Sequence, residues 1–414
     1  MKYFLKAVSA VIILGITVVI AFITWQFNAY SPHIVDQKPV PENLKYFQNS
    51  YTECRKSFIE DSEKLTGIYN NLEISALKIK TRSDPDLSID YCYIPAQTAA
   101  HRLLIISSGV HGVEGYAGSA VQQMILTELV KKLNFDELGL LLIHGVNPYG
   151  FRYNRRVNEN NVDLNRNCSA DPALFGTINS GYDRLNMFLN PRHRVNLTSF
   201  DNFFFHLTAV KKILQYSMSS LRQAILQGQY QYPRGIYFGG NRLEPSILAV
   251  SSLIRKTAQP YSTVLSIDLH TGYGANGRLH LFPNPVKDKK KKARIEKIFS
   301  DRPINWGNTD DFYTITGEFA TYIGSIIPDK DYMTMTFEFG TMDTNTTMGS
   351  IKALHNVIIE NQGTWYGYAS KQDETKTKKR FIRGYYPESE KWRSKIIEEA
   401  RKTLIRAVKA YQAI

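Results

Sequence analysis

Hydrophobic residues form one long uninterrupted segment near the N-terminus and then recur in shorter segments separated by polar turns. Residues 7–25 contain no charged side chain and are long enough to cross a bilayer, which requires about 20 apolar residues. A cleaved signal peptide usually has a shorter apolar core, followed by small residues at the cleavage site. The sequence therefore favours an uncleaved anchor, and cleavage, which would give a secreted protein, is the alternative.

These features divide the chain into four parts. The two lysines of a short tail, residues 1–6, favour the cytoplasmic side of a membrane for the N-terminus. Residues 7–25 are then a transmembrane anchor, and residues 26–45, which contain three prolines, are a linker. We expect a single-pass membrane protein whose remaining part, residues 46–414, lies outside the cytoplasm, in the periplasm or the extracellular space.

Within residues 46–414 the hydrophobic pattern alternates between the periods of strands and helices. Residues 103–106, 138–146 and 263–269 are short apolar runs typical of buried strands. Residues 119–133 carry apolar side chains at helical spacing between the first two runs. Because a strand, a helix and a second strand in this order indicate a parallel sheet, we predict an α/β domain with a mixed, mostly parallel sheet flanked by helices.

Further segments extend this sheet and cover it. Residues 72–79 and 87–94 alternate polar and apolar side chains and predict a hairpin at the sheet edge. Residues 332–340 alternate strictly and predict another strand, and residues 279–282 a short one. Helices are expected at residues 46–69, 203–228, 243–258, 347–369 and 388–413.

The composition, with 43% hydrophobic and 21% charged residues, is that of an ordinary globular protein. The formal net charge of +13 is spread along the chain and partly collected in residues 289–292 and 371–383, which favours a solvated surface. Since no segment interleaves aromatic and basic residues as single-strand binders do, we expect no nucleic-acid partner. Three scattered cysteines, Cys54, Cys92 and Cys168, are too few for a disulfide framework and favour packing.

The chemistry begins at Ser-Ser-Gly-Val-His-Gly-Val-Glu-Gly, residues 107–115, directly after the first buried strand. Parallel strands present ligand-binding groups at their C-terminal ends, which is where His111 and Glu114 lie. An imidazole and a carboxylate three residues apart can both turn toward one metal ion. The three glycines favour a tight turn over a helix and distinguish this segment from the helical H-E-x-x-H motif. By spacing alone the pair is weak evidence for a metal.

Three more polar features follow the strands. Residues 155–167 are too rich in Asn and Arg to be core, and Arg156 and Arg166 would suit an anionic group, although a solvated loop has the same composition. His270 follows the strand at 263–269, where a structural role is the alternative to a ligand. Glu338 has apolar neighbours near a strand end; its burial is costly without a metal or partner, so it is a candidate base.

Taken together, four motifs resemble those of the M14 metallocarboxypeptidase superfamily, the zinc carboxypeptidases, and they occur in the same order. The Gly-Val-His-Gly-x-Glu-Gly opening is more similar to the bacterial branch known as the domain of unknown function DUF2817. The resemblance extends over roughly residues 45–385. The motifs are His111-x-x-Glu114, Val162-Asp163-Leu164-Asn165-Arg166-Asn167, His270 and Thr336-Phe337-Glu338.

The resemblance implies roles for these residues. It implies one zinc ion per chain, held by His111, Glu114 and His270, with the fourth position left to water. Glu338 resembles the general base and Arg156 the arginine that stabilises the oxyanion, while the adjacent Arg155 could exchange roles with Arg156.

The remaining positions concern substrate. Asn165 and Arg166 match the pair that binds a terminal carboxylate, and Tyr313 resembles the mobile tyrosine of the family. Asp163 matches the carboxylate that orients a ligand histidine.

The implied reaction is zinc-dependent hydrolysis of an amide, or peptide, bond of the carboxypeptidase type. An insertion at about residues 170–242, whose Tyr- and Gly-rich part at 228–240 would suit the wall of a pocket, leaves the substrate open. A deacylase or amidase acting on N-acyl amino acids or cell-wall peptides is one alternative. A membrane-anchored, non-catalytic binding protein for anionic peptides is another.

Overall fold

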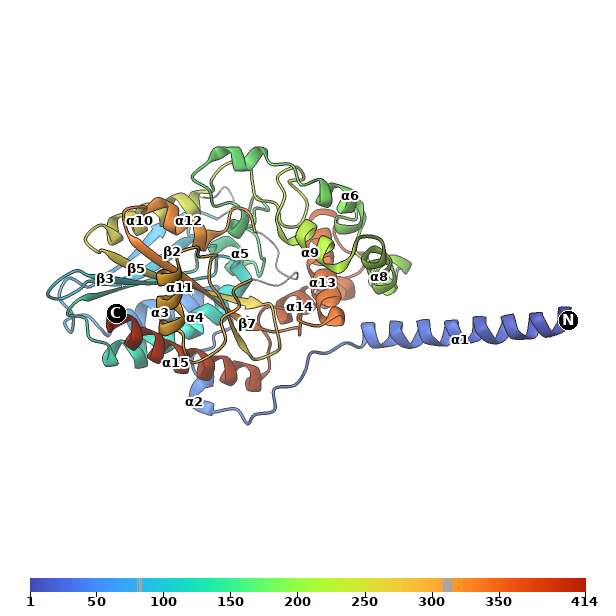
Figure 1. Ribbon diagram of the computed structural model, residues 1–414, viewed down its shortest axis with the longest axis horizontal. Helices are drawn as coiled ribbons and strands as arrows, with labels where there is room; N and C mark the ends of the chain where they lie inside the picture. The colour runs from blue at the N-terminus through green and yellow to red at the C-terminus, as the bar shows by residue number, and fades with distance from the viewer. Residues whose placement is uncertain (80, 82–83, 308–314) are drawn as a thin grey trace.

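The computed structural model describes residues 1–79, 81, 84–307 and 315–414. A rounded body contains a central sheet, and the helix α1 (Lys2–Asn28) projects from it as a rod (Figure 1). The predicted α/β architecture with a mixed, mostly parallel sheet is confirmed.

In the described part of the chain the sheet has seven strands, in the order β1-β2-β4-β3-β5-β7-β6. The middle strands β4, β3, β5 and β7 run parallel to one another, and β1, β2 and β6 run antiparallel to their neighbours. The predicted hairpin of β1 and β2 lies at the sheet edge, as expected. The strands are β1 (Glu73–Lys78), β2 (Ser88–Ile94), β3 (Arg102–Ser108), β4 (Leu138–His144), β5 (Thr263–Gly272), β6 (Leu279–Phe282) and β7 (Asp331–Gly340).

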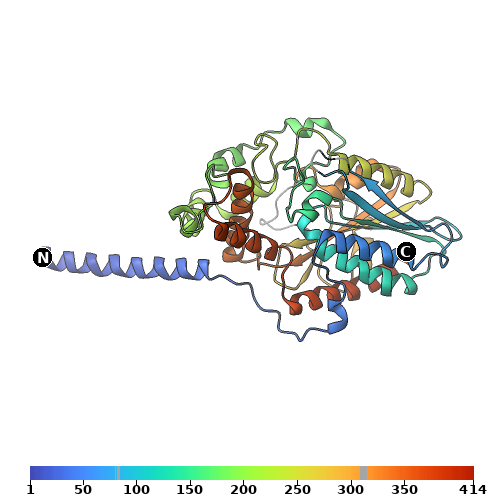
Figure 2. The ribbon, with the colours of Figure 1, turned by 180° about the vertical axis from the view of Figure 1, so that it is seen from behind.

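The central strands are apolar on both faces because helices cover the sheet on both sides, as Figures 1 and 2 show. One face is covered by α4, which α3 and α15 both contact, and the other by α10 and α12. The carboxyl ends of β3, β5 and β7 meet at one edge of the sheet. These helices are α3 (Tyr51–Glu63), α4 (Gly115–Met124), α10 (Pro245–Ala258), α12 (Phe319–Ile326) and α15 (Glu390–Gln412).

The helix predicted at residues 203–228 is broken in the structure, so that prediction was wrong. It consists of α8 (Phe205–Tyr216) and α9 (Met218–Leu226), separated by Ser217 with φ of 68°. The Ser217 hydroxyl accepts a hydrogen bond from the backbone N–H of Ser220 and caps α9. A serine in the left-handed region is uncommon, and apolar periodicity on both sides conceals the break.

Residues 170–242, which were predicted to be an insertion, pack beside α13 (Thr347–Tyr366) and α14 (Lys371–Arg383). Besides α8 and α9 they contain α6 (Ser180–Leu189) and the short α7 (Phe200–Phe203). These helices share a second hydrophobic cluster, which includes Phe205, Ile351 and Phe381 and is separate from the core around the sheet. The basic segment read as solvated surface is thus the amphipathic helix α14, which buries Thr377 and Phe381.

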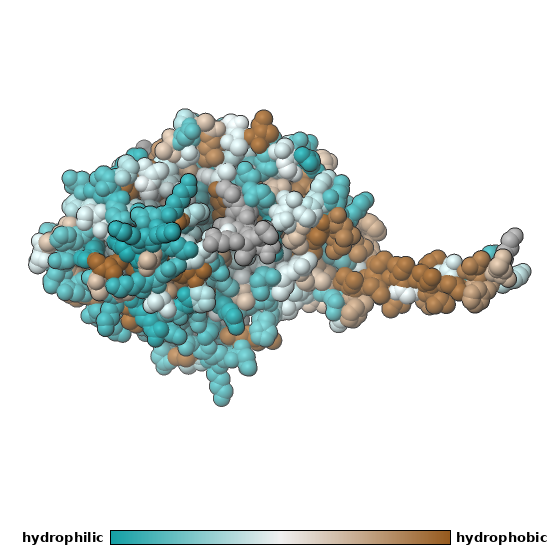
Figure 3. Space-filling model, viewed as in Figure 1, coloured by the Kyte–Doolittle hydropathy of each residue, from teal (hydrophilic) through white to brown (hydrophobic). Residues whose placement is uncertain are grey.

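The part of α1 from Tyr3 to Asn28 is long and apolar enough to cross a membrane, a property that a signal sequence shares. Its side chains are mostly exposed, and they form the long hydrophobic rod visible in Figure 3. Its last turn differs, since Phe27 is 0% exposed and Thr24 is 3% exposed against the body.

Candidate metal centre and active site

The turn after β3 places His111 and Glu114 at the carboxyl edge of the sheet. Gly109 has φ of +70°, and a Cβ at Gly112 would lie 2.1 Å from the backbone carbon of Gly150, so no larger residue fits there. The chain turns through the short 3-10 helix η1 (Gly112–Glu114). The predicted tight turn is confirmed up to Glu114, while Gly115 already begins α4.

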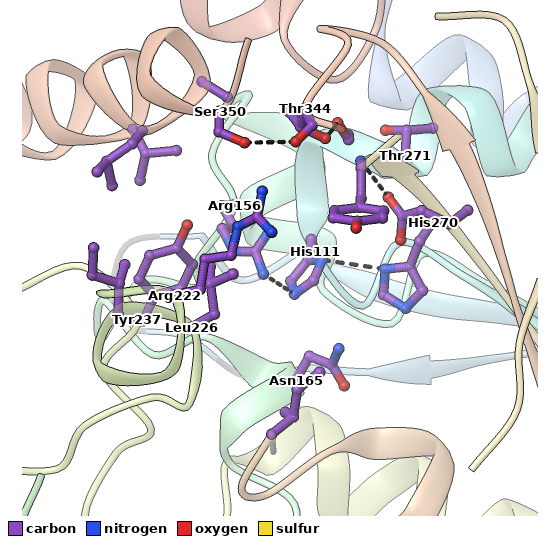
Figure 4. Close-up of a pocket in the computed structure, with 18 of the residues that line it drawn as sticks. His111, Arg156, Asn165, Arg222, Leu226, Tyr237, His270, Thr271, Thr344 and Ser350 are labelled. Carbon is purple, nitrogen blue, oxygen red and sulfur yellow. Dashed lines mark hydrogen bonds between the residues drawn. The ribbon is translucent and has the colours of Figure 1, made fainter. Parts of the chain in front are cut away.

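Three buried side chains converge at this edge: His111, Glu114 and His270, the last near the end of β5. Their ligand atoms all lie within 4.8 Å of one another. Each carboxylate oxygen of Glu114 is 2.9 Å from an imidazole Nδ1, Oε1 from that of His111 and Oε2 from that of His270. The two Nδ1 atoms are 3.2 Å apart (Figure 4). Two imidazole nitrogens and a carboxylate facing one point are a donor set that fits a divalent metal ion.

A carboxylate stands behind each imidazole. Asp163 Oδ1 is 3.2 Å from His111 Nε2, and Asp268 Oδ2 is 2.6 Å from His270 Nε2. These contacts turn the Nδ1 atoms toward each other and toward Glu114, as carboxylates behind metal-bound histidines do. Asp163 was expected, but Asp268 was not, although it precedes His270 by two residues in one strand and so lies on the same face.

The electrostatics of these groups favour positive charge between them. Burial alone would lower the pKa of His270, but Asp268 and Glu114 hold it well above its ordinary value. Burial would raise the pKa of Glu114, but the adjacent His111 and His270 lower it. The site therefore stabilises a cation, which a bound metal ion also supplies.

Glu338 lies across from His270, since the two residues are paired in the register of β5 and β7. Its Oε1 accepts a hydrogen bond of 2.8 Å from the backbone N–H of Tyr273. Burial, and next the negative charge of Glu114, raise the pKa of Glu338 to about 7. A carboxyl group that titrates near neutrality is suited to accept and return a proton.

Arg156 reaches the same point from the loop after α5 (Pro148–Arg152). Its Nε donates to Asp163 Oδ2 at 2.9 Å, and its Nη2 lies 2.6 Å from His111 Nε2. The guanidinium also stacks on Tyr237, with 5.3 Å between the guanidinium carbon and the ring centroid. Burial would lower the pKa of Arg156, but Asp163 holds it well above its ordinary value.

Arg155 points elsewhere. Its Nε donates to Glu360 Oε1 at 3.0 Å and its Nη2 to Asn161 Oδ1 at 3.2 Å, and it does not line the cavity that contains His111, Glu114 and His270. Of the two arginines, the described structure brings Arg156 to the site.

Asn165 and Arg166 lie on the 3-10 helix η4 (Leu164–Arg166), which Asp163 caps by accepting from the Asn165 N–H. Both residues line the cavity. Asn165 Oδ1 accepts from the N–H of Phe319, and Arg166 donates from Nη1 to the Asn165 carbonyl and from Nε to that of Leu226. Tyr313, the remaining predicted substrate contact, lies outside the described residues.

Comparison with known proteins agrees with the motifs. The family model for Protein of unknown function (DUF2817) matches residues 47–399. The chain belongs to this family. The predicted membership in the DUF2817 branch is thereby confirmed, and a comparison with curated proteins finds no significant match.

Solved structures that match include bovine thrombin-activatable fibrinolysis inhibitor, determined with a tick carboxypeptidase inhibitor, at 13% identity and a TM-score of 0.43, covering 77% of this chain and 97% of that one. Carboxypeptidase A from Helicoverpa armigera matches at 14% identity with a TM-score of 0.40, and the match covers 82% of this chain and 75% of that one. Murein-tripeptide amidase MpaA from Escherichia coli O157 matches at 17% identity with a TM-score of 0.34, and the match covers 71% of this chain and 94% of that one. Because these scores lie below 0.5, we base the function on the site itself.

In this DUF2817 chain His111, Glu114 and His270 open into a cavity of about 550 Å³, a size typical of small-molecule sites. Tyr237, from the Tyr- and Gly-rich segment expected to wall a pocket, lines it, and so does Tyr385. Sequence reasoning did not identify either tyrosine individually, because an isolated aromatic residue in a loop carries no pattern. All three cysteines are free and buried, and burial raises the pKa of each thiol, which agrees with the predicted packing role.

Proposed function

We propose that this protein is a zinc-dependent hydrolase that cleaves an amide bond, most simply a peptide bond next to a free carboxylate. The observation that carries the proposal is the convergence of His111, Glu114 and His270, with Glu338 paired opposite in the sheet register. Two histidines and a glutamate form a known catalytic zinc set, in which the fourth position remains open. One zinc ion per chain follows from this donor set.

Each residue has a distinct task in the proposed reaction. Zinc, when bound, lowers the pKa of a water molecule and polarises the scissile carbonyl. Glu338 accepts a proton from the attacking water and returns it to the nitrogen as the C–N bond breaks and the C–O bond forms. Its raised pKa supports both transfers near neutral pH.

Arg156 and the η4 residues act on the substrate. Arg156 donates to the carbonyl oxygen as negative charge develops there, an interaction typically worth about 3 kcal/mol. Asn165 and Arg166 bind the carboxylate beside the scissile bond. Asp163 and Asp268 keep the two imidazole rings oriented.

α1 serves as an uncleaved anchor in this proposal, with the body outside the cytoplasm, in the periplasm or extracellular space. Its last turn supports retention, because Thr24 and Phe27 are buried against the body. Thr24 Oγ1 lies 3.0 Å from His206 Nε2, and Lys352 Nζ donates to the Phe27 carbonyl at 3.1 Å. Cleavage near residues 21–30 would expose this surface.

The substitution Glu338→Gln tests the reaction. It keeps the shape of the side chain but removes the base, so we expect zinc to stay at about one per chain while kcat falls by roughly 10²–10⁴-fold. Zinc is measured by elemental analysis, and turnover is measured on a panel of peptides. Glu63→Gln, on the exposed part of α3, is the matched control.

The outcomes are separable. Activity retained in Glu338→Gln would refute the assignment of Glu338 as the base. Stoichiometric iron or no metal in the wild-type protein would refute the zinc site. The panel also includes N-acyl amino acids and peptides with an amidated C-terminus. A preference for N-acyl amino acids would favour the deacylase. Cleavage of amidated peptides would favour an amidase, and peptide binding without zinc or turnover would favour the non-catalytic peptide binder.

A further inference from the structure

The cavity at the candidate metal site continues between α8, α9 and α13, where most of the lining side chains are hydrophobic and Lys212, Arg222, Ser350 and Asn356 are the polar ones. We propose that this apolar chamber holds a long acyl chain, so that the substrate is an amide-linked lipid such as an N-acylated amino acid or peptide. The inference rests on the proposed hydrolase and names its substrate class. The chamber is defined by Ile213 of α8, Leu221 and Ile225 of α9, and Ile351, Leu354 and Val357 of α13.

The composition of the walls argues for an apolar occupant. Leu221, Ile225, Ile351 and Val357 are each 6–7% exposed and belong to the second hydrophobic cluster. Protein interiors are normally close-packed, and aliphatic walls offer water few hydrogen-bond partners. A hydrocarbon chain, in contrast, gains about 0.8 kcal/mol for each methylene group removed from water.

The chamber also has a suitable position relative to the reacting groups. In Figure 4, Leu226 and Tyr237 lie on the opposite side of His111 from His270. The same cavity is lined by Glu338 and by Arg156. An acyl chain in the chamber would therefore extend away from the metal ligands while its amide group reaches them.

One face of α8 connects the chamber with the end of α1. Ala209 and Ile213 on this face line the cavity. Phe205 and His206, about one turn earlier on the same face, pack on Phe27 of α1, with ring centroids 6.4 Å and 4.9 Å from that of Phe27. The chamber thus begins about one helical turn from the contact between α1 and the body.

The solvent-facing surface of α7 and α8 carries large apolar side chains beside polar ones such as Lys211 and Gln215. Phe203, Val210 and Leu214 are 41%, 41% and 83% exposed, and the Phe203 carbonyl accepts a hydrogen bond from Asn28 of α1. Figure 3 shows hydrophobic surface on the body where α1 joins it. With α1 in the membrane, these side chains would contact lipid, which would place the chamber close to a bilayer that contains amphiphilic substrates.

A chain-length series tests the proposal on the full-length protein in phosphatidylcholine nanodiscs. The substrates are N-acetyl-, N-hexanoyl- and N-dodecanoyl-alanine, with acetyl-Leu-Leu-Leu-Ala as an apolar peptide. We expect kcat/KM to rise by roughly three- to fourfold per methylene while the chamber has room. Ile225→Trp and Ala209→Phe, which fill the chamber, should lower the dodecanoyl-to-acetyl ratio by at least about tenfold. Leu248→Trp, at a 53% exposed position of α10, should leave the ratio unchanged.

A binding measurement gives a readout that does not depend on turnover. N-Dodecanoyl-alanine with a diazirine at the end of its chain is photolysed with the Glu338→Gln protein, and the labelled peptides are identified by mass spectrometry. We expect labels within α9 and α13, reduced at least about tenfold by Ile225→Trp and not by Leu248→Trp. Labels restricted to α1 and the outer face of α8 would overturn the proposal.

The results distinguish an error in the acyl-chain proposal from an error in the proposed hydrolase function. Glu338-dependent cleavage without chain-length preference would overturn the acyl chamber and leave the hydrolase intact. If acetyl-Leu-Leu-Leu-Ala is the best substrate, the chamber binds peptide side chains and the acyl proposal is overturned. Zinc bound without turnover of any substrate would instead refute the hydrolase, whatever the photolabelling shows.

Discussion

At the scale of single residues, the site consists of carboxylates and imidazoles that fix one another's orientation. Glu114 contacts both histidines, and each histidine has its own carboxylate behind it, Asp163 or Asp268. Such an arrangement is costly to bury unless its charges are matched. The geometry of the three candidate ligands is therefore determined as much by Asp163 and Asp268 as by the candidate ligands themselves.

Asp268→Asn tests this dependence. The amide keeps the size of the side chain but loses the charge that holds His270 Nε2, so we expect zinc affinity to fall by about 10–100-fold. The measurement is competition with a chromophoric chelator. Asp136→Asn, at an exposed position, is the control, and an unchanged affinity in Asp268→Asn would show that His270 is oriented by its packing alone.

At the scale of elements, the turn after β3 connects the sheet to the site. A Cβ on Gly112 would approach the backbone of Gly150 and Phe151 to within 2.1–2.3 Å, and backbone atoms cannot move aside as a flexible side chain can. The turn therefore holds its position only with glycine there. It is also the element that places His111 and Glu114 together.

Gly112→Ala should lower both stability and zinc content. Overpacking of this kind typically costs about 1–3 kcal/mol, and displacement of η1 would separate two of the three ligands. Thermal unfolding and elemental analysis of the purified variant measure the two effects. Gly176→Ala is a matched control, because a Cβ there meets nothing within 4 Å, and equal behaviour of the two variants would contradict the steric argument.

Elements with strong periodicity were predictable from sequence, and elements that depend on tertiary context were not. β3, β5 and β7 were predicted because central strands are continuously apolar or strictly alternating, and their ends located His111, His270 and Glu338. The break between α8 and α9 escaped prediction because its cause is one backbone conformation at Ser217. The helix α14 was missed because its charged residues resemble solvated surface when its buried partners are unknown.

At the scale of the whole molecule, α1 is joined to the body rather than only tethered to it. Phe27 belongs to the hydrophobic cluster that also contains residues of α8, α13 and α14. We predict that protein extracted from membranes has the intact mass of the full chain, that carbonate does not release it, and that protease added outside the cytoplasm digests its body. A mass reduced by cleavage near residues 21–30 would contradict the anchor and leave the metal site unaffected.

The contact between α1 and the body, which we call the junction, contains the buried Lys352. We expect this lysine to make the stability of the folded protein depend on pH. Lys352 is 4% exposed and donates to the carbonyl of Phe27, with its Nζ 4.4 Å from the centre of that ring. Burial, and next the positive charge of Arg380, lower the pKa of Lys352 from 10.5 to about 7. The neighbouring His206 and His355 also have lowered pKa values, chiefly through burial.

The direction of the pH effect follows from these pKa values. Below about pH 7 Lys352 is charged in both the folded and the unfolded protein, and the folded protein bears the full cost of burying that charge. Between about pH 7 and 10.5 the unfolded chain binds more protons than the folded one, so this residue makes stability increase with pH. We expect the Tm of the wild type, relative to that of Lys352→Met, to rise by at least about 2 °C from pH 6.5 to 9.5. Lys402→Met, at an exposed position of α15, should show no such change. A difference between wild type and Lys352→Met that is constant with pH would mean that Lys352 stays charged at the junction, held by the Phe27 carbonyl and ring.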